Sequence, residues 1–308
     1  MTFPRTVALA FLTACVSLAL FLLVACGSSS KGFQGGSDAS ADGAKGDGGD
    51  GGDGSTTAPG LGVLSFLQDP DSGTGTFGGG FALATDGKLP AGCTVVDGGA
   101  CVTTSCPAAG DAGAGDAAAS DAAAPTAPNA GTLTVTGGPV FGTTGFGVSP
   151  DKAGTYFYEA PHIFVAGTSL GVAGAGATVP AFTTQNVVAP GQMKLTAPAA
   201  GTGGKITIPT TADLTVTWTG GTAGAKVYFT VNAAFTGSAG GASMTCSWDG
   251  SAGTGTVPKA ALAPFSAANA AGADATWNQA AQTSFSAGAW PVTLSAGFTA
   301  QGALVTFQ

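Results

Sequence analysis

Hydrophobic and polar residues alternate with a period of two in several short stretches of the chain. In DLTVTWTGG (213–221), Leu214, Val216 and Trp218 alternate with threonines. The same alternation recurs in GTLTVTGG (131–138), ITI (206–208), KVYFTV (226–231) and PVTL (291–294). This period is typical of strands with one buried and one solvent-facing side. The pattern therefore predicts half-buried antiparallel strands whose apolar faces, Trp218 included, form a core.

Glycine and proline interrupt these stretches roughly every 8–15 residues, a spacing typical of β-sandwiches and barrels. We expect an all-β fold, an antiparallel β-sandwich of immunoglobulin-like or related type. The stretch TVTWTGGTAGAKVYFTV (215–231) predicts a hairpin. One short helix is expected in PKAALAPF (258–265), whereas the alanine-rich stretch 266–282 is compatible with helix, strand or coil.

Residues 107–130 are a low-complexity stretch of alanine, glycine and aspartate. Such a composition buries too little apolar surface to fold, so we expect disorder. Before it, the pattern predicts strands at 61–67, 76–84 and 93–106, too few to be stable alone except as a disulfide-linked hairpin. We expect one β-sandwich domain over 61–308 with a disordered insertion at 107–130. The alternative is a cysteine-bearing module at 61–106, joined by a linker to a sandwich at 131–308.

The start of the chain has a different pattern. Arg5 is followed by an almost wholly apolar run, residues 7–25, which ends at Cys26. A positive charge before an apolar run is typical of a secretory signal peptide, here 1–25. Leu23-Val24-Ala25-Cys26 resembles the lipobox of bacterial lipoproteins. This resemblance implies that the chain is cut before Cys26 and that Cys26 carries acyl chains, palmitate among them. The alternative is an uncleaved anchor, because the run approaches bilayer-spanning length.

Residues 26–60 follow the signal peptide and are rich in glycine, serine, aspartate and alanine, with Phe33 as the one aromatic residue. We expect a disordered tether, because this composition cannot offset backbone entropy. Two or more acyl chains would hold the protein stably at a membrane. Gly27 stands where inner-membrane retention favours Asp, so we expect the outer membrane.

Charge excludes one class of partner. The net charge is −8, but eight of the 17 acidic residues lie within 38–53 and 111–121. From residue 61 onward, leaving out 111–121, nine acidic residues stand against six lysines, and Arg5 is the only arginine. A nearly neutral body without a basic stripe is not expected to bind nucleic acid.

Four cysteines remain after the signal peptide and Cys26, namely Cys93, Cys101, Cys106 and Cys246. An even number in an exported protein predicts two disulfides. CTVVDGGACVTTSC (93–106) predicts a hairpin. A two-residue turn at Gly98-Gly99 would place Val95 opposite Val102 and favours Cys93–Cys106 with Cys101–Cys246. A three-residue turn over 97–99 would instead place Cys93 and Cys101 on one face, so the pairing stays open.

Few residues suggest catalysis. GTSLG (167–171) matches the G-x-S-x-G nucleophile motif at Ser169. That chemistry needs a following helix and a histidine later in the chain, whereas the only histidine, His162, precedes the serine. A β-turn is the interpretation that we favour. A carboxylate pair, Asp151 with Glu159, is a second possibility. We expect no catalysis from either.

Two tryptophans are candidates for ligand binding. Trp248 and Trp277 lie near predicted turns, and exposed aromatic rings there would stack on sugar rings. The cysteine spacing C-x7-C-x4-C, with a single histidine in the chain, does not fit a zinc site. We expect neither a metal nor another cofactor.

LVAC at 23–26, TVTW at 215–218 and the hairpin cysteines together resemble a loosely defined group of bacterial lipoproteins, which carry an immunoglobulin-like or similar β-sandwich behind an acidic tether. The resemblance implies a location and a fold but no activity. Two hypotheses follow. The first is a lipid-anchored module of the cell envelope that is structural or binds protein or polysaccharide. The second is a secreted hydrolase that uses Ser169 with His162, or the carboxylate pair.

Overall fold

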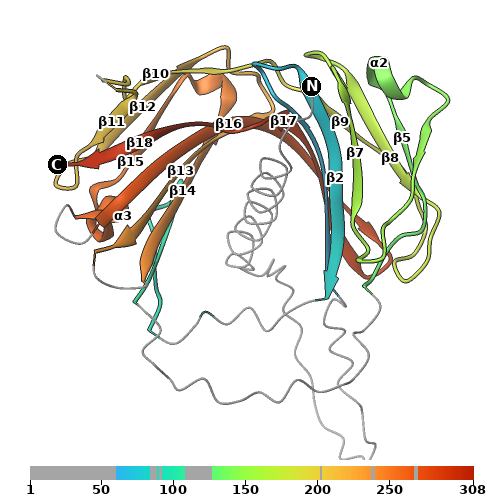
Figure 1. Cartoon of the computed structure of the whole chain (residues 1–308), viewed down its shortest axis with the longest axis horizontal. Helices are drawn as coiled ribbons and strands as arrows, with labels where there is room; N and C mark the ends of the chain where they lie inside the picture. Colours follow the sequence, from blue (N-terminus) through green and yellow to red (C-terminus); the bar gives the residue numbers. More distant parts are fainter. Residues whose placement is uncertain are drawn as a thin grey trace, which may run out of the picture. The chain divides into compact units, whose positions relative to one another are not determined.

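A computed structural model of the chain describes residues 60–83, 89, 92–107, 127–201, 203–236, 240–266 and 270–308. Gly60–Gln308 form one compact unit. Its regular structure is almost entirely strand (Figure 1), so the expected all-β sandwich is confirmed. The predicted signal peptide, Cys26, the tether and most of the 107–130 insertion lie outside the described residues.

The unit contains two hydrophobic cores. The first lies between two layers of strands and includes the fully buried Leu64, Phe77, Leu133 and Leu294. One layer contains β1 (Gly60–Gln68), β2 (Thr74–Leu83), β7 (Tyr156–Pro161) and β17 (Trp290–Phe298). The other is a four-stranded sheet of β5 (Leu133–Thr136), β6 (Phe146–Val148), β8 (Ser169–Gly174) and β9 (Phe182–Val188), with the short α2 (Gly138–Phe141) after β5.

The second core contains Val216, Phe229, Met244 and Phe265. One of its layers consists of β3 (Thr94–Asp97), β4 (Cys101–Cys106), β11 (Lys205–Ile208), β13 (Ala225–Phe235), β14 (Gly241–Asp249) and β18 (Gln301–Phe307). The facing sheet consists of β10 (Lys194–Ala197), β12 (Leu214–Thr219) and β15 (Thr254–Val257). Three helical turns complete this part, namely η1 (Gly250–Ala252), α3 (Lys259–Leu262) and η2 (Ala263–Phe265).

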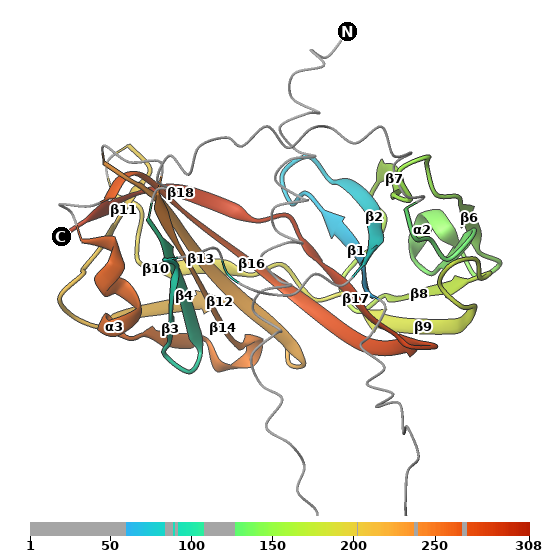
Figure 2. The ribbon, with the colours of Figure 1, turned by 90° about the horizontal axis from the view of Figure 1, so that it is seen from below.

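One long strand, β16 (Ala270–Ala287), connects the two parts (Figure 2). Its first part pairs with β13 and β18, and its last part pairs with β17. The large sheet is therefore continuous, in the order β3-β4-β14-β13-β16-β17-β1-β2-β7, with β18 beside β16 and β11 beside β18. Each core thus uses a different stretch of one shared sheet.

The period-two alternation identified the buried faces correctly. In β12, Leu214, Val216 and Trp218 are buried, and the Trp218 indole N–H donates to the Gly250 carbonyl at 2.8 Å. In β5 and β13 the predicted apolar faces are buried as well. The expected helix at 258–265 forms as α3 and η2, while most of the alanine-rich stretch 266–282 belongs to β16.

The hairpin predicted for 215–231 is wrong. β12 pairs with β10 and β15, whereas β13 pairs with β14 and β16 in the other layer. The chain crosses the core between Thr219 and Ala225 instead of turning back within one sheet. Alternation cannot distinguish the two arrangements, because it shows which face of a strand is buried and not which strand lies beside it.

One further expectation is corrected by the pairing. The strands are not all antiparallel, since β1 runs parallel to β17 and β11 runs parallel to β18. The strands within 61–106 contribute to both cores. β1 and β2 contribute to the first core, whereas β4 contributes Cys101 to the second.

Candidate functional site

Along one edge of β16, the paired strand changes from β18 to β17. β17 and β18 lie on the same side of β16, where Ala280 pairs with Gly297 and Trp277 pairs with Gln301. Two residues of β16, Asn278 and Gln279, therefore lie opposite the three residues 298–300. An extra residue on one strand is a β-bulge, a feature over-represented near binding sites. On the outer side of these strands, β1 pairs with β17 only as far as Phe298, and β11 pairs with β18 only from Leu304 onward.

A tight turn leaves the sheet beside this bulge. It runs from Asp69 to Gly73 between β1 and β2, and the Asp69 carboxylate accepts hydrogen bonds from the backbone N–H groups of Asp71 and Ser72, both at 2.8 Å. The Ser72 hydrogen bond is the main cause that lowers the pKa of Asp69, so this carboxyl is ionised at neutral pH. Gly73 has φ +71°, and a Cβ there would meet the His162 ring at 2.3 Å.

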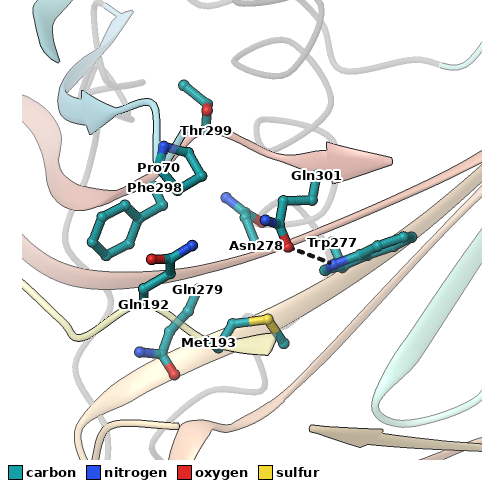
Figure 3. A pocket seen from close by; sticks show the side chains of 9 residues that line it. All are labelled: Pro70, Gln192, Met193, Trp277, Asn278, Gln279, Phe298, Thr299 and Gln301. Atoms are coloured by element: carbon teal, nitrogen blue, oxygen red, sulfur yellow. Dashed lines mark hydrogen bonds between the residues drawn. The ribbon is translucent and has the colours of Figure 1, made fainter. Parts of the chain in front are cut away.

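The turn and the bulge together line a solvent-open hollow of about 490 Å³, which we call the Trp277 depression. Its lining comprises Asp69, Pro70, Asp71, Trp277, Thr299, Ala300, Gln301 and Gly302. Trp277 is half-buried, and its indole N–H donates to Gln301 Oε1 at 3.2 Å (Figure 3). This hydrogen bond holds side chains of two neighbouring strands together. Asp71 is exposed, and its carboxylate takes no part in the hydrogen bonds of the turn.

A smaller hollow beside the depression is nearly filled. It is lined by Gln192, Met193, Asn278, Gln279 and Phe298 in addition to residues shared with the depression (Figure 3). Its free volume of about 10 Å³ is at the limit for one water molecule. The Trp277 depression is therefore the part of this region with room for a ligand.

The buried side chain of Gln279 fixes the backbone behind the Trp277 depression. Its amide N–H₂ donates to the Gly191 carbonyl at 2.9 Å and to Thr222 Oγ1 at 3.1 Å. Its oxygen accepts from the Thr222 N–H at 3.0 Å. Three hydrogen bonds to one fully buried amide make this support rigid, because each broken bond would leave a buried polar group unpaired.

The two tryptophans predicted as a pair differ in their surroundings. Trp248 is half-buried and stacks on Trp218, with ring centroids 5.8 Å apart at 28°. Its ring also covers Gly255, where a Cβ would lie 2.3 Å from the indole. Trp277 alone of the two lines the depression. Neither residue is exposed in the manner that the sequence suggested.

Ser169 and His162 occupy separate environments. Ser169 is the exposed first residue of β8 and follows a β-turn in which the Thr168 N–H donates to the Val165 carbonyl at 3.1 Å. His162 lies after β7, where its backbone N–H donates to the Gly73 carbonyl at 2.8 Å. Within the described part of the chain, no hydrogen bond joins the two side chains. A β-turn thus accounts for Gly167 and Thr168 at the start of GTSLG, whereas Ser169 and the two residues after it belong to strand β8.

The carboxylates of Asp151 and Glu159 are likewise not brought together by any hydrogen bond of the described residues. Asp151 accepts from the N–H groups of Ala153 and Thr155, both at 2.8 Å. Glu159 is exposed on β7, opposite Thr76 of β2. Asp151 thus stabilises its own turn, and Glu159 faces solvent from a different element.

Both disulfides have the pairing that the sequence favoured, Cys93–Cys106 and Cys101–Cys246. The turn itself differs from the expectation. Val95 pairs with Thr104 instead of Val102, and the Gly98 N–H donates to the Cys101 carbonyl at 2.8 Å, so the turn residues are Gly99 and Ala100. The register is shifted by two residues. An even shift keeps every side chain on its face, which is why the cysteine pairing is unchanged.

Two kinds of feature are absent from the described ranges. No group of three or more His, Cys, Asp or Glu side chains there could hold a metal ion. No helix in those ranges is both long and apolar enough to cross a membrane.

Sequence reasoning did not identify most of the depression. Asp69, Asp71, Thr299 and Gln301 carried no motif, and they come from chain segments more than 200 residues apart. The stretch DPDSG (69–73) has the residue types of a tight turn and could have been identified as one. Its position beside Trp277 depends on the sheet and not on the local sequence.

Comparisons with known proteins add little. No protein-family model matches the chain, and no curated protein is significantly similar to it. Among solved structures, the crystal structure of the chicken CNTN1 FN1–FN3 domains matches with 10% identity and a TM-score of 0.19, covering 74% of this chain and 77% of that chain. A similarity at this level supports no conclusion about function.

Proposed function

We propose that this chain is a ligand-binding β-sandwich protein of the cell envelope, anchored by acyl chains on Cys26, and that its ligand is a polysaccharide. The observation that carries the proposal is the Trp277 depression. There Trp277, half-buried against the second core, lines an open hollow together with amide, hydroxyl and carboxylate residues.

The lining suits a sugar because each sugar ring has an apolar face and a rim of hydroxyl groups. The part of the Trp277 ring that the second core leaves uncovered offers an apolar contact. Gln301, Thr299 and Asp71 offer donors and acceptors around it. This polar lining favours a polysaccharide over a protein partner, since the cores of protein interfaces are depleted of charged residues.

The location rests on separate support. The apolar run that ends in LVAC at 23–26 resembles a lipoprotein signal, and the acidic stretch after it suits a tether. The two disulfides also favour an oxidising compartment outside the cytoplasm. We place the protein at the outer membrane, because Gly27 follows the predicted lipid site.

The test is binding of the full-length chain to a panel of polysaccharides, namely peptidoglycan, chitin, chitosan, cellulose and dextran. We expect at least one to bind, and Trp277→Ala to weaken that binding about tenfold or more, because the apolar contact of a large side chain contributes on the order of 1.5–3 kcal/mol. Phe157→Ala is the matched control, since Phe157 is an aromatic side chain 55% exposed on β7 and outside the depression.

Circular dichroism of both variants shows whether the fold is retained. If no polysaccharide in the panel binds the wild type, the proposal is wrong. It is also wrong if Trp277→Ala folds normally and binds as tightly as Phe157→Ala.

A further inference from the structure

We infer that the Trp277 depression selects sugars that carry a positive charge, so that its ligand is a polymer containing free amino sugars. This inference rests on the proposed function and deepens it by naming the class of sugar. The observation is the charge of the lining, which includes two carboxylates, Asp69 and Asp71, and no lysine, arginine or histidine.

The two carboxylates have different roles. Asp69 accepts two backbone hydrogen bonds within its own turn, which fixes the turn and keeps a negative charge at the edge of the depression. Asp71 is exposed, and only its backbone N–H is used in the turn. Its carboxylate is therefore available to a ligand. Together they place negative charge on one element of the lining.

The indole supplies the second half of a cation site. Trp277 comes from β16, a different element from the turn, and it lines the same hollow. The face of a tryptophan ring attracts ammonium groups, and the attraction increases where water is excluded. A ring and a carboxylate beside the same space recognise an ammonium group better than a neutral hydroxyl. The ring also provides the apolar contact that a sugar ring needs.

A metal ion is a poorer fit than an ammonium group. Calcium takes six to eight oxygen ligands, often from several carboxylates. No cluster of three or more such side chains exists in the described ranges. The Asp69 oxygen is also already occupied by two N–H groups. An organic cation needs fewer ligands and makes use of the indole.

The experiment compares two oligosaccharides with the same sugar backbone, the hexamer of glucosamine with free amino groups and the hexamer of N-acetylglucosamine with neutral acetamide groups, by calorimetric titration of the full-length chain. We expect the glucosamine hexamer to bind about tenfold more tightly at low salt, because both the ring and the carboxylates act on its ammonium groups. Raising the salt concentration should reduce this preference, since exposed charges are screened.

Asp71→Asn is the diagnostic variant. It should weaken binding of the glucosamine hexamer about three- to fivefold and change binding of the N-acetylated hexamer less than about twofold, the size expected for one exposed ion pair. Asp274→Asn is the matched control, because it removes one negative charge at an exposed position of β16 outside the depression. That control should leave both affinities unchanged.

The inference is overturned if the two hexamers bind equally, or if Asp71→Asn weakens both to the same degree. It is overturned as well if hexalysine binds as tightly as the glucosamine hexamer and Trp277→Ala leaves that binding unchanged, because the ligand would then be a basic peptide. If a neutral polysaccharide binds through Trp277 and neither hexamer does, the inference fails while the proposed function stands. If no polysaccharide binds at all, both fail.

Discussion

Tyr156 is a fully buried residue whose hydroxyl completes backbone hydrogen bonds outside the sheets. The hydroxyl donates to the Gly131 carbonyl at 2.8 Å and accepts from the Ala130 N–H at 2.8 Å. Burial raises the pKa of this hydroxyl, and the Ala130 hydrogen bond opposes that shift in part. The neutral form is therefore the form that stabilises the fold.

We expect Tyr156→Phe to lower the free energy of unfolding by about 1–3 kcal/mol at neutral pH, because the buried Ala130 N–H and the partly buried Gly131 carbonyl lose their partner. In the unfolded chain a tyrosine ionises near its ordinary pKa of about 10. The stabilisation by Tyr156 is therefore complete below that pH and declines as the pH rises toward the raised pKa of the folded state. Urea unfolding at pH 7 and near pH 11 measures both effects.

Tyr158→Phe is the control for this prediction. Tyr158 is half-buried and contacts the rings of Phe141 and Phe146, contacts that a phenylalanine retains. We expect Tyr158→Phe to lower the free energy of unfolding by no more than about 0.5 kcal/mol. An equal loss in the two variants, or a difference between wild type and Tyr156→Phe that does not shrink at high pH, would contradict the argument.

Single residues could be assigned from the sequence where their role was to be buried in a strand. Leu133, Val216 and Phe229 are buried as the alternation predicted. Asp69 and Gln301 could not be assigned, because their role depends on neighbours from distant segments. A polar side chain in a turn has the same sequence signal whether it faces open solvent or a binding site.

At the scale of elements, the shared strand β16 and the bulge opposite it determine where the depression lies. The extra residue between Gly297 and Gln301 changes which residues of the strand point inward. In β17 the buried positions are even-numbered, as in Val292 and Leu294, whereas in β18 the inward residues are odd-numbered, as in Phe307. The bulge thus allows β17 to turn its apolar side chains into the first core and β18 to turn its apolar side chains into the second, while both strands pair with the same edge of β16.

Deletion of Ala300 tests this role. Without the extra residue, β18 must either turn its apolar side chains to solvent or shift along β16, because a one-residue shift moves every side chain to the other face. Losing the buried contacts of Val305 and Phe307 should cost at least about 3 kcal/mol of unfolding free energy. Polysaccharide binding should be lost too, since Ala300 and its neighbours line the depression.

Ala300→Ser keeps the chain length and serves as the control for this deletion. Ala300 is exposed, so the free energy of unfolding of this variant, measured in urea, should lie within about 0.5 kcal/mol of the wild-type value. A deletion variant with wild-type stability would show that the bulge is dispensable.

The sequence predicted the positions of the strands well, but it did not predict which strands pair with one another. Strands β1, β2, β5, β11, β12, β13 and β17 lie within a few residues of the predicted stretches. The hairpin over 215–231 was wrong because the five residues between β12 and β13 can turn back or cross the core equally well. In the cysteine hairpin the disulfide pairing was predicted correctly although the turn was not. Whether the register shift is odd or even decides which cysteines share a face, and here the shift is even.

At the scale of the whole molecule, the sequence divides the chain into an apolar start, an acidic stretch and a nearly neutral body. The body is one compact unit from Gly60 to Gln308. In the proposed lipoprotein, attachment to the membrane would depend on one residue, Cys26. An acylated Cys26 would hold the body at a membrane through the 26–60 segment, so that the Trp277 depression would act on polymers of the envelope.

Metabolic labelling of a bacterium that expresses the full-length chain with radioactive palmitate measures this attachment. We expect the label on the wild type, none on Cys26→Ser, and a mature chain that begins at Cys26. Cys15→Ser is the matched control, because Cys15 lies in the segment that would be removed and its loss should leave labelling intact. Label that survives Cys26→Ser, or a mature chain with another first residue, would refute lipid anchoring at this residue.

The sequence by itself determined the fold class, most strands with their buried faces, and which cysteines share a face of their hairpin. Each of these follows from the order of side chains along a short segment. The tertiary structure decided the partners of each strand, the two cores on one sheet and the Trp277 depression. Those features depend on contacts between segments far apart in the chain, such as the Asp69–Gly73 turn and the bulge before Gln301. Local periodicity carries no information about such contacts, so only the folded chain could bring the indole and the carboxylates to one place.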